Sequence, residues 1–503
     1  MSIVLKKIVV VNKFLVILSL LWFTGCSQSK ESKKPNFIFI LVDDLGKEWV
    51  ETYGAEEIET PNINALAENG ITFNNAYSMP QCTPSRLALL TGQYPYVNGW
   101  INHYDVPRWG HGVNFDTTKN PSFAKALQEA GYATCVAGKW QINDFRIEPN
   151  AMEKAGFDAY CMWTGYESEN KPSDKRYWDP YIFTKEGSKT YEGEFGPDIF
   201  SNFIIDFMTA HRNEPMCVYY PMVLTHSPFV HTPHEPEANT KYQKHKAMVR
   251  YTDFIIGNIL KSLKELHIED NTYLVCTTDN GTSPGIIGKR DSVYVRGGKS
   301  YLTENGINAP FLVITPDKQH FKTDALIDFT DVYPTLLDLA EIENRTKASG
   351  YSFADILNGK TKESKRDWIL SMGGLSAKIS DDNKMENWFT FRDRVLRDEQ
   401  YKVYTDTLKH IVRVFNLKKD PYETQNIIDN VAAKPILQKF RKIISGLPNK
   451  DAQPKYSRTI DSLYNEPVEK LNCCGGPKGA RKDNMMKLAT EELFLKQLQL
   501  MTK

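Results

Sequence analysis

One cysteine stands where neither a strand nor a disulfide explains its surroundings. Cys82 lies in "SMPQCTPSRLALLTG", between Pro80 and Pro84 and four residues before Arg86. Prolines at this spacing disfavour a strand, whereas Pro84 fits the first turn of a helix that the apolar "LALLTG" continues. A group at a helix start faces free backbone N–H groups, which bind anions. Cys82 is therefore the first candidate for a chemical role.

Acidic and amide side chains follow two apolar runs that are far apart in the sequence. Asp43 and Asp44 end "PNFIFILVDDLG", and Asp279 and Asn280 end "NTYLVCTTDNG". Taken singly, Asp-Asp and Asp-Asn-Gly are typical of turns. If both runs are parallel strands, however, their carboxyl ends lie at the edge of the sheet where ligands bind. Four oxygen-bearing side chains without a soft ligand suit a hard cation, Ca²⁺ or Mg²⁺, rather than zinc.

The order of elements along the chain supports that arrangement. Unbroken apolar runs are typical of strands covered on both faces, as in parallel sheets. Helical and strand patterns alternate in "SFAKALQEAGYATCVAGKW", "DIFSNFIIDFMTAHRNEPMCVYYPMV", "MVRYTDFIIGNILKSLKELHIEDNTYLVCTTDNG" and "APFLVITP" with "DFTDVYPTLLDLAEI". This alternation predicts an α/β fold, a large mostly parallel sheet with helices on both faces.

The pattern changes after about residue 365. "WFTFRDRVLRDEQYKVYTD" and "HIVRVFNLKKDPYETQNI" alternate apolar and polar residues, which is typical of antiparallel strands with one solvated face. "NMMKLATEELFLKQLQLM" closes the chain as an amphipathic helix. We expect a catalytic domain over residues 36–365 and a smaller C-terminal α+β subdomain over residues 366–503.

Charge and the N-terminus narrow the function classes. The 503 residues carry equal numbers of basic and acidic side chains, so no global field favours binding to nucleic acid or to an anionic membrane. Residues 1–25 have lysines ahead of a short apolar run, typical of a secretory signal rather than a membrane span. "FTGC" resembles a bacterial lipobox that would lipidate Cys26, while a plain signal peptide is the alternative. Residues 26–35 would form a solvated tether of an exported, periplasmic or cell-surface lipoprotein.

The other cysteines do not suggest a disulfide framework. Cys135, Cys217 and Cys276 lie inside apolar runs, where cysteine acts as a small hydrophobe, and Cys161 is similar but less clear. The adjacent pair Cys473 and Cys474 has no assigned role.

These motifs together resemble the type I sulfatase family of the alkaline-phosphatase-like superfamily. The resemblance rests on "CTPSR", followed by "LTGQYPYVNG". It is supported, in the order that the family shows, by "LVDDLG", "GYATCVAGKW", "THSP", "TTDNG", "GGKSYLTENG", "DVYPTLLDLA" and "FNLKKDPYETQNI". The match spans about residues 35 to 427 and implies an alkaline-phosphatase-like fold with an antiparallel sheet in the smaller C-terminal part.

The resemblance implies a modified nucleophile at residue 82. In similar proteins the cysteine of C-x-P-S-R is oxidised to formylglycine, an aldehyde, by a maturase, which would be a partner of this chain. The hydrated aldehyde has two hydroxyls: one attacks sulfur and the other drives sulfate release, whereas a serine would stop at a stable ester. The family also favours calcium over magnesium as the ion that joins residue 82 to a sulfate oxygen, with Asp43, Asp44, Asp279 and Asn280 as its other ligands.

Four cationic or titratable positions match the family's pocket. Arg86 would brace the hydrated aldehyde, and Lys139 in "AGKW" and Lys299 in "RGGKS" would hold the sulfate. His226 in "LTHSP" would protonate the leaving alcohol. Each residue alone is more typical of a solvated lysine or a packed histidine.

One position departs from the family pattern. The family reads G-K-W-H, but this chain reads "GKWQ", and Gln141 hydrogen-bonds without taking up a proton. Either another base serves or Gln141 only orients sulfate. His103 and His111 in "NHYDVPRWGHG" are candidate substitutes or substrate contacts.

Three functions fit the sequence. The first is a sulfatase acting on a sulfated small molecule or glycan; aromatic residues in "YESENKPSDKRYWDPY" would stack on sugars or anchor the loop. The second is a phosphonate or phosphodiester hydrolase with the same site. The third is a non-catalytic glycan-binding lipoprotein, favoured only by Gln141.

Overall fold

A computed structural model of the chain describes residues 33–101, 113–143, 145, 148–163, 176–343, 348–373, 377–379, 385–387, 389–458 and 488–499. Cys26, His103, His111, Cys473 and Cys474 lie outside the described residues. All elements below belong to the compact unit Pro35–Lys503. Within the described part of the chain, no helix combines the length and the apolar character needed to cross a membrane.

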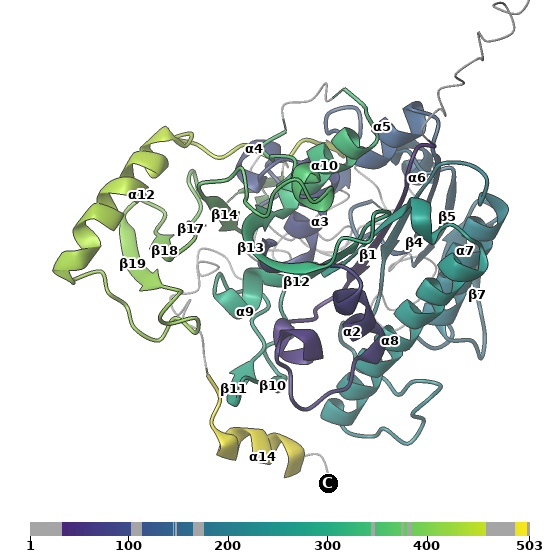
Figure 1. The fold of residues 1–503 in the computed structure, drawn as a ribbon, viewed down its shortest axis with the longest axis horizontal. Helices are drawn as coiled ribbons and strands as arrows, with labels where there is room; N and C mark the ends of the chain where they lie inside the picture. Colours follow the sequence, from purple (N-terminus) through teal and green to yellow (C-terminus); the bar gives the residue numbers. More distant parts are fainter. Residues whose placement is uncertain are drawn as a thin grey trace, which may run out of the picture. The chain divides into compact units, whose positions relative to one another are not determined.

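A ten-stranded sheet forms the centre of this unit, in the order β13-β2-β12-β9-β1-β8-β4-β5-β6-β7 (Figure 1). Its strands are β1 (Asn36–Val42), β2 (Ile71–Tyr77), β4 (Ala133–Lys139), β5 (Ala159–Trp163), β6 (Tyr181–Thr184), β7 (Gly187–Thr190), β8 (Met216–Pro221), β9 (Thr272–Thr278), β12 (Asn308–Ile314) and β13 (Phe321–Asp328). The five strands from β9 to β5 are mutually parallel. Antiparallel neighbours flank them, β12 on one side and β6 on the other.

The apolar runs become strands because both of their faces are covered. All seven residues of β1 are buried. Successive side chains of a strand point to opposite faces, so Phe39 packs in one hydrophobic cluster and Ile40 in another. The prediction of a sheet covered on both faces is confirmed.

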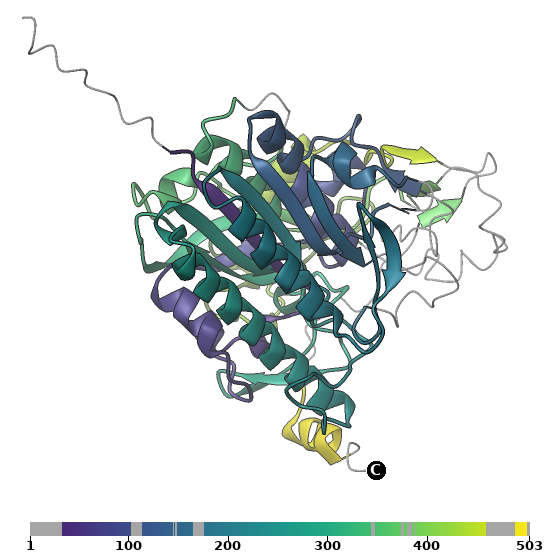
Figure 2. The same cartoon turned by 90° about the vertical axis from the view of Figure 1, so that its right-hand side faces the viewer.

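Two helix layers provide this cover. One layer contains α2 (Pro61–Glu68), α7 (Gly196–Ala210) and α8 (Lys241–Glu265). The other contains α3 (Cys82–Thr91), α5 (Phe123–Glu129), α6 (Ala151–Ala155), α10 (Val332–Leu339) and α11 (Ala354–Leu357). Figure 2 shows the long helices α7 and α8, in teal, lying across one face of the sheet.

Short elements complete the described part of the chain. They are the helices α4 (Pro95–Asn98) and α9 (Glu304–Ile307), and the two-stranded pairs β10 (Ile287–Arg290) with β11 (Val293–Arg296), β15 (Ala377–Ile379) with β16 (Met385–Asn387), and β20 (Tyr456–Arg458) with β3 (Val113–Phe115). Single turns of 3₁₀ helix are η1 (Lys47–Trp49), η2 (Glu51–Tyr53), η3 (Glu269–Asn271), η4 (Phe329–Asp331) and η5 (Val431–Ala433).

A second, antiparallel sheet follows, as predicted. It has the order β14 (Ile369–Met372), β17 (Arg394–Arg397), β18 (Tyr401–Thr405) and β19 (Ile411–Asn416), and helix α12 (Lys434–Gly446) accompanies it. Phe440 of α12 and Leu396 of β17 share a hydrophobic cluster with Leu41 of β1. The smaller sheet is therefore packed onto the larger part through a continuous core.

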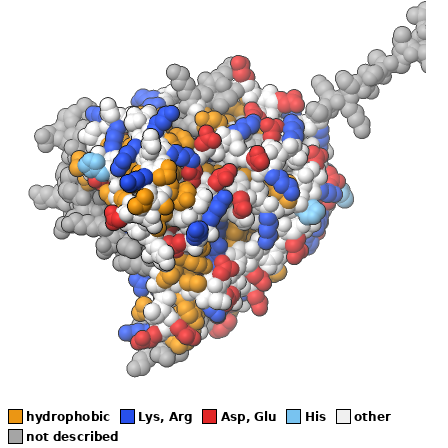
Figure 3. Space-filling model, turned by 60° about the vertical axis from the view of Figure 1, so that its left-hand side comes forward, with side chains coloured by type: hydrophobic (Ala, Val, Ile, Leu, Met, Phe, Trp, Pro, Cys, Tyr) orange, Lys and Arg blue, Asp and Glu red, His pale blue; other side chains and the backbone are white. Residues whose placement is uncertain are grey.

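The last helix begins later than the sequence pattern predicts. α14 spans Glu491–Gln499, and Phe494 packs against Tyr242 of α8 and Tyr294 of β11. Gln497 exchanges two hydrogen bonds with the backbone of Ile287. The helix thus adds to the β10–β11 pair rather than to the second sheet. In the view of Figure 3, hydrophobic side chains, in orange, lie among mixed positive and negative charges on the surface.

Four cysteines are buried in the large sheet, as their apolar surroundings predict. Cys135, Cys161, Cys217 and Cys276 are free thiols with at most 5% exposure. Burial raises the pKa of Cys161, Cys217 and Cys276 to about 12. These thiols are therefore part of the core and not reactive groups.

A buried histidine in α8 makes the fold sensitive to acid. His245 is fully buried, with its ring 4.5 Å from Trp49 and 5.1 Å from Phe229. Neither ring nitrogen has a hydrogen-bond partner among the described residues. Burial, assisted by Lys241, lowers the pKa of His245 to about 3. The histidine is therefore neutral in the folded chain at any pH near neutrality.

We expect the free energy of unfolding to fall as the pH drops below about 6.5, where His245 takes up a proton only in the unfolded chain. Between pH 7 and pH 4.5, His245 alone should lower the free energy of unfolding by about 2 to 3 kcal/mol. Urea unfolding of the wild type and of His245→Phe at both pH values measures the effect, and the variant should lose less stability in acid. His320→Phe, at an exposed histidine, is the control. Equal acid losses for His245→Phe and the wild type would refute the assignment.

Candidate active site

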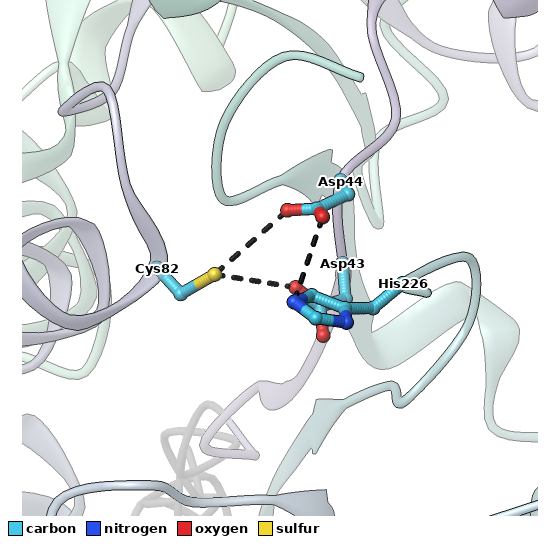
Figure 4. Close-up of side chains that lie close together, drawn as sticks. All are labelled: Asp43, Asp44, Cys82 and His226. Carbon is cyan, nitrogen blue, oxygen red and sulfur yellow. Dashed lines mark hydrogen bonds and ion pairs between the residues drawn. The ribbon is translucent and has the colours of Figure 1, made fainter. Parts of the chain in front are cut away.

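Cys82 is the first residue of α3, whose ten residues are all buried. Gln81 before it is extended, and the helix ends at Gly92 in the left-handed conformation. The sulfur of Cys82 lies 3.5 Å from Asp43 Oδ1 and 3.8 Å from Asp44 Oδ1 (Figure 4). Burial, with Asp279 adding to it, raises the pKa of Cys82 well above its usual value. The thiol is therefore protonated and a weak nucleophile in this site.

The second sheet supports the segment that leads into α3. Ser371 of β14 donates a hydrogen bond of 2.8 Å to the carbonyl of Ser78, and the backbone N–H of Met372 points at the sulfur of Met79. Ser85 closes the turn, since its hydroxyl lies 2.9 Å from the carbonyl of Met79. The position of Cys82 is thus fixed from both parts of the fold.

The acidic and amide residues meet because β1 and β9 are adjacent parallel strands. Val42 and Thr278 are register partners, so the residues that follow them reach the same edge of the sheet. Asn280 donates a hydrogen bond of 2.7 Å to Asp44 Oδ1, across 236 residues of sequence. The backbone N–H of Asp44 donates to Asp279 Oδ1 at 3.2 Å. The structure therefore brings together the four residues that the sequence analysis grouped.

Two cations enter the cluster from α3 and β4. Arg86 lies one helical turn after Cys82 and binds Asp279 Oδ2 through Nε at 3.1 Å and through Nη2 at 2.7 Å. Lys139, the last residue of β4, has its Nζ 2.6 Å from Asp43 Oδ2 and 3.5 Å from the Cys82 sulfur. Arg86 also donates to the carbonyl of Lys139 at 2.9 Å, which ties the two cations to each other.

A third cation and a histidine lie on the other side of Asp44. Lys299 Nζ is 2.6 Å from Asp44 Oδ2. His226 Nε2 is 3.7 Å from the same oxygen, and the His226 side chain is 21% exposed. Burial, together with Lys299 and Lys139, lowers the pKa of His226 well below its usual value. His226 Nδ1 lies 2.5 Å from the carbonyl of Ser227, so Nε2 is the nitrogen that faces Asp44 and Cys82.

The oxygen ligands fit a divalent cation. Asn280 Oδ1 is buried and has no hydrogen-bond partner among the described residues. One ligand atom from each of Asp43, Asp44, Cys82 and His226 lies within 4.8 Å of the others. Burial and the charges of Asp43 and Asp44, opposed by Arg86 and Lys139, raise the pKa of Asp279 to about 6. A bound Ca²⁺ or Mg²⁺ would offset the repulsion among these carboxylates and use the free amide oxygen.

Gln141 follows β4 by two residues, at φ 65°, and its side chain is partly buried. The structure therefore places it at the same edge of the sheet as Lys139. Both alternative histidines, His103 and His111, lie outside the described residues.

Two positioning residues were not singled out from the sequence. Gly138 has φ 114°, and a Cβ there would lie 2.2 Å from the carbonyl oxygen of Pro221. Glycine is thus required for β4 and β8 to approach where Lys139 enters the site. The hydroxyl of Tyr177 lies 2.8 Å from the carbonyl of Val223 and also meets that of His226. Gly138 could have been found from the sequence because it stands next to the candidate lysine, whereas no motif marked Tyr177.

Comparisons with known proteins find relatives over most of the chain. The family model "Sulfatase" matches residues 35–342, and "N-sulphoglucosamine sulphohydrolase, C-terminal" matches residues 298–450. The N-acetylgalactosamine-6-O-sulfatase of Bacteroides thetaiotaomicron is 31% identical in an alignment 395 residues long, which covers 63% of this chain and 76% of that protein. The ulvan-active sulfatase of Formosa agariphila is 25% identical over 427 residues, 80% of this chain and 78% of that protein.

Solved structures share the fold. The crystal structure of Ps i-CgsB has a TM-score of 0.69 and 23% identity, and covers 86% of this chain and 96% of its own. The same protein has been solved in complex with k-i-k-neocarrahexaose. A further structure, a complex with its substrate D-glucosamine-2-N,6-O-disulfate, has a TM-score of 0.64 and 19% identity, and covers 84% of this chain and 100% of its own.

Proposed function

The chain belongs to the sulfatase family, and from that premise we propose that it removes sulfate from sulfated glycans with a formylglycine made from Cys82. The observation that carries the proposal is the assembly around the Cys82 sulfur, with Asp43, Asp44 and Lys139 within hydrogen-bond distance. Because the pKa of Cys82 is raised in this site, the encoded thiol is a poor nucleophile at neutral pH. Conversion to an aldehyde, whose hydrate supplies two hydroxyls, would remove that obstacle.

The surrounding residues have distinct roles in this proposal. Lys139 and Lys299 hold the sulfate and offset the charge that builds up on its oxygens. Arg86 holds Asp279 and the carbonyl of Lys139 in place, beside residue 82. Asp43, Asp44, Asp279 and Asn280 would hold Ca²⁺, or Mg²⁺ as the alternative, which would polarise the S–O bond when bound.

His226 is the general acid in this proposal. Its lowered pKa leaves it neutral in the free site, and the negative charge of the bound sulfate ester favours protonation of Nε2, which then gives that proton to the oxygen of the leaving alcohol. His226→Gln should lower kcat about 10²- to 10³-fold for a sulfated sugar, because an alkoxide leaves poorly without a proton. The same change should lower kcat for 4-nitrophenyl sulfate less than tenfold, since its leaving group is stable as an anion. Parallel kinetics with both substrates test this.

His231→Gln, in the same loop, is the matched control and should leave both rates near those of the wild type. Equal losses for both substrates in His226→Gln would assign His226 to sulfate binding instead of proton transfer.

The relatives support the proposed substrate class. The two relatives described above are named for N-acetylgalactosamine 6-sulfate and for ulvan, and one structural neighbour holds a sulfated glucosamine. Desulfation of a panel of sulfated mono- and oligosaccharides, with matched phosphate esters, tests the proposal. Turnover of phosphate esters alone would favour the phosphonate or phosphodiester hydrolase.

Mass spectrometry of the Cys82 peptide, after expression with a formylglycine-generating maturase, tests the modification. An unmodified thiol together with retained glycan binding would favour the non-catalytic lipoprotein. We further propose export and lipidation at Cys26, which labelling with a fatty-acid analogue and a Cys26→Ala variant would test.

A further inference from the structure

Arg176 is a buried cation that the mechanism above does not use. This residue is only 3% exposed and lies on the segment between β5 and β6. The guanidinium carbon lies 4.1 Å from the ring centroid of Trp163 and 5.8 Å from that of Tyr177. Nε and Nη1 are buried and have no hydrogen-bond partner among the described residues.

Every other buried arginine in the described ranges has an acidic partner. These pairs are Arg86 with Asp279, Arg366 with Asp331, Arg392 with Asp393, Arg394 with Asp451 and Arg397 with Glu304. A buried charge without a partner is costly, so proteins rarely keep one that has no counter-charge. Arg176 is therefore a buried cation for which the described residues supply no counter-charge.

Two contacts place Arg176 at the edge of the sheet that carries the site. Trp163, which it covers, is the last residue of β5 and the register partner of Lys139. The adjacent Tyr177 reaches the carbonyl of His226 through its hydroxyl. Arg176 thus lies close to the loop that carries His226.

The stacking on Trp163 leaves the donors of Arg176 available. A guanidinium over an aromatic ring uses its flat face, while its N–H groups point outward in the plane. Those donors form a fork that matches the two oxygens of a carboxylate or a sulfate. The tryptophan therefore holds the arginine in an orientation suited to an anion.

The strand order sets Arg176 to one side of the lysine that holds the cleaved sulfate in the proposed function. Lys139 lies 3.5 Å from the Cys82 sulfur, and Trp163 stands one strand farther from β1, about 5 Å away in the hydrogen-bonding direction. We propose that Arg176 binds a second anionic group of the substrate, a carboxylate or a further sulfate, beside the ester that is cleaved. This inference rests on the proposed sulfatase function and adds the charge pattern of its substrate.

The test compares matched substrates that differ in one anionic group. The panel contains a monosulfated hexosamine, the same sugar with a second sulfate, and the same sugar joined to a uronate, with 4-methylumbelliferyl sulfate as a substrate bearing one charge. The wild type should prefer at least one doubly charged substrate about tenfold or more in kcat/KM. Arg176→Met should remove that preference through KM and leave 4-methylumbelliferyl sulfate within about threefold. The doubly charged substrate that the wild type prefers identifies the second anionic group as a sulfate or a carboxylate.

Two further variants control for folding and for charge alone. Arg176→Lys keeps the charge without the fork and should retain only part of the preference. Lys189→Met removes an exposed cation 4.4 Å from the Tyr191 ring, away from the site, and should change none of the ratios. Thermal unfolding shows whether each variant is folded.

Three results would overturn the inference: no preference in the wild type, a preference unchanged in both Arg176 variants, or equal losses on all substrates. The last would mean that Arg176 holds the cleaved sulfate or only supports the fold. Failure of the proposed function gives a different result, no sulfate release from any substrate by the matured wild type.

Discussion

Cys82→Ser should reduce kcat by about 10⁴-fold or more, because a serine supplies one hydroxyl where turnover needs two. The serine oxygen would occupy the place of the sulfur, 3.5 Å from Asp43 Oδ1, so binding of substrate should persist. One sulfate group should accumulate on the peptide that contains residue 82, detectable by mass spectrometry. Steady-state assays with a sulfated sugar measure the loss.

Cys161→Ala is the matched control. This cysteine is buried in β5 at 2% exposure and is not in contact with the cluster around residue 82. The Cys161→Ala substitution should lower the free energy of unfolding by about 1 kcal/mol, because it leaves a small cavity, and should leave kcat near that of the wild type. Retention of multiple turnovers by Cys82→Ser would eliminate the proposed nucleophile.

Removal of divalent cations should have the second-largest effect. Loss of a metal that neutralises charge in the transition state is worth several kcal/mol, so EDTA treatment should lower kcat/KM about 10³-fold or more. Ca²⁺ should restore activity. It should also raise the Tm of the wild type, since it offsets repulsion among Asp43, Asp44 and Asp279.

Asp44→Ala tests the same site without a chelator. The variant should lose activity to a similar extent, and Ca²⁺ should no longer raise its Tm, because a principal ligand is missing. Asp270→Ala removes an exposed ion pair with Lys318 and should behave like the wild type in both measurements. Full activity in EDTA together with a Tm that is insensitive to Ca²⁺ would exclude the metal site.

The alternation of apolar helices and strands predicted the α/β class and the two covered faces. It did not distinguish parallel from antiparallel strands in the large sheet. β12 is buried like its parallel neighbours, yet it runs antiparallel to β9. A strand covered on both faces has the same composition in either direction, so its direction depends on the connections. The strand β2, with Asn74 and Asn75 in its second half, carried no clear period and was not anticipated.

The candidate site was predictable as a set of residues but not as a set of contacts. The ends of β1 and β9 could be grouped because parallel strands deliver their last residues to one edge. Which cation pairs with which carboxylate depends on side-chain packing, and the sequence contains no period that reports it. The tyrosine at residue 177 illustrates the limit: its hydroxyl fixes the loop of His226, but its surroundings in the sequence look like any aromatic loop.

The hydrogen bond from Ser371 to Ser78 spans 293 residues and has a consequence for the timing of biosynthesis. β14 supports the segment that leads into residue 82, and it is made only in the last third of translation. The maturase proposed above would therefore have open access to this cysteine before that part of the chain has folded. In the folded chain Cys82 is enclosed, at 1% exposure, so we expect the proposed oxidation to precede folding of the last third of the chain.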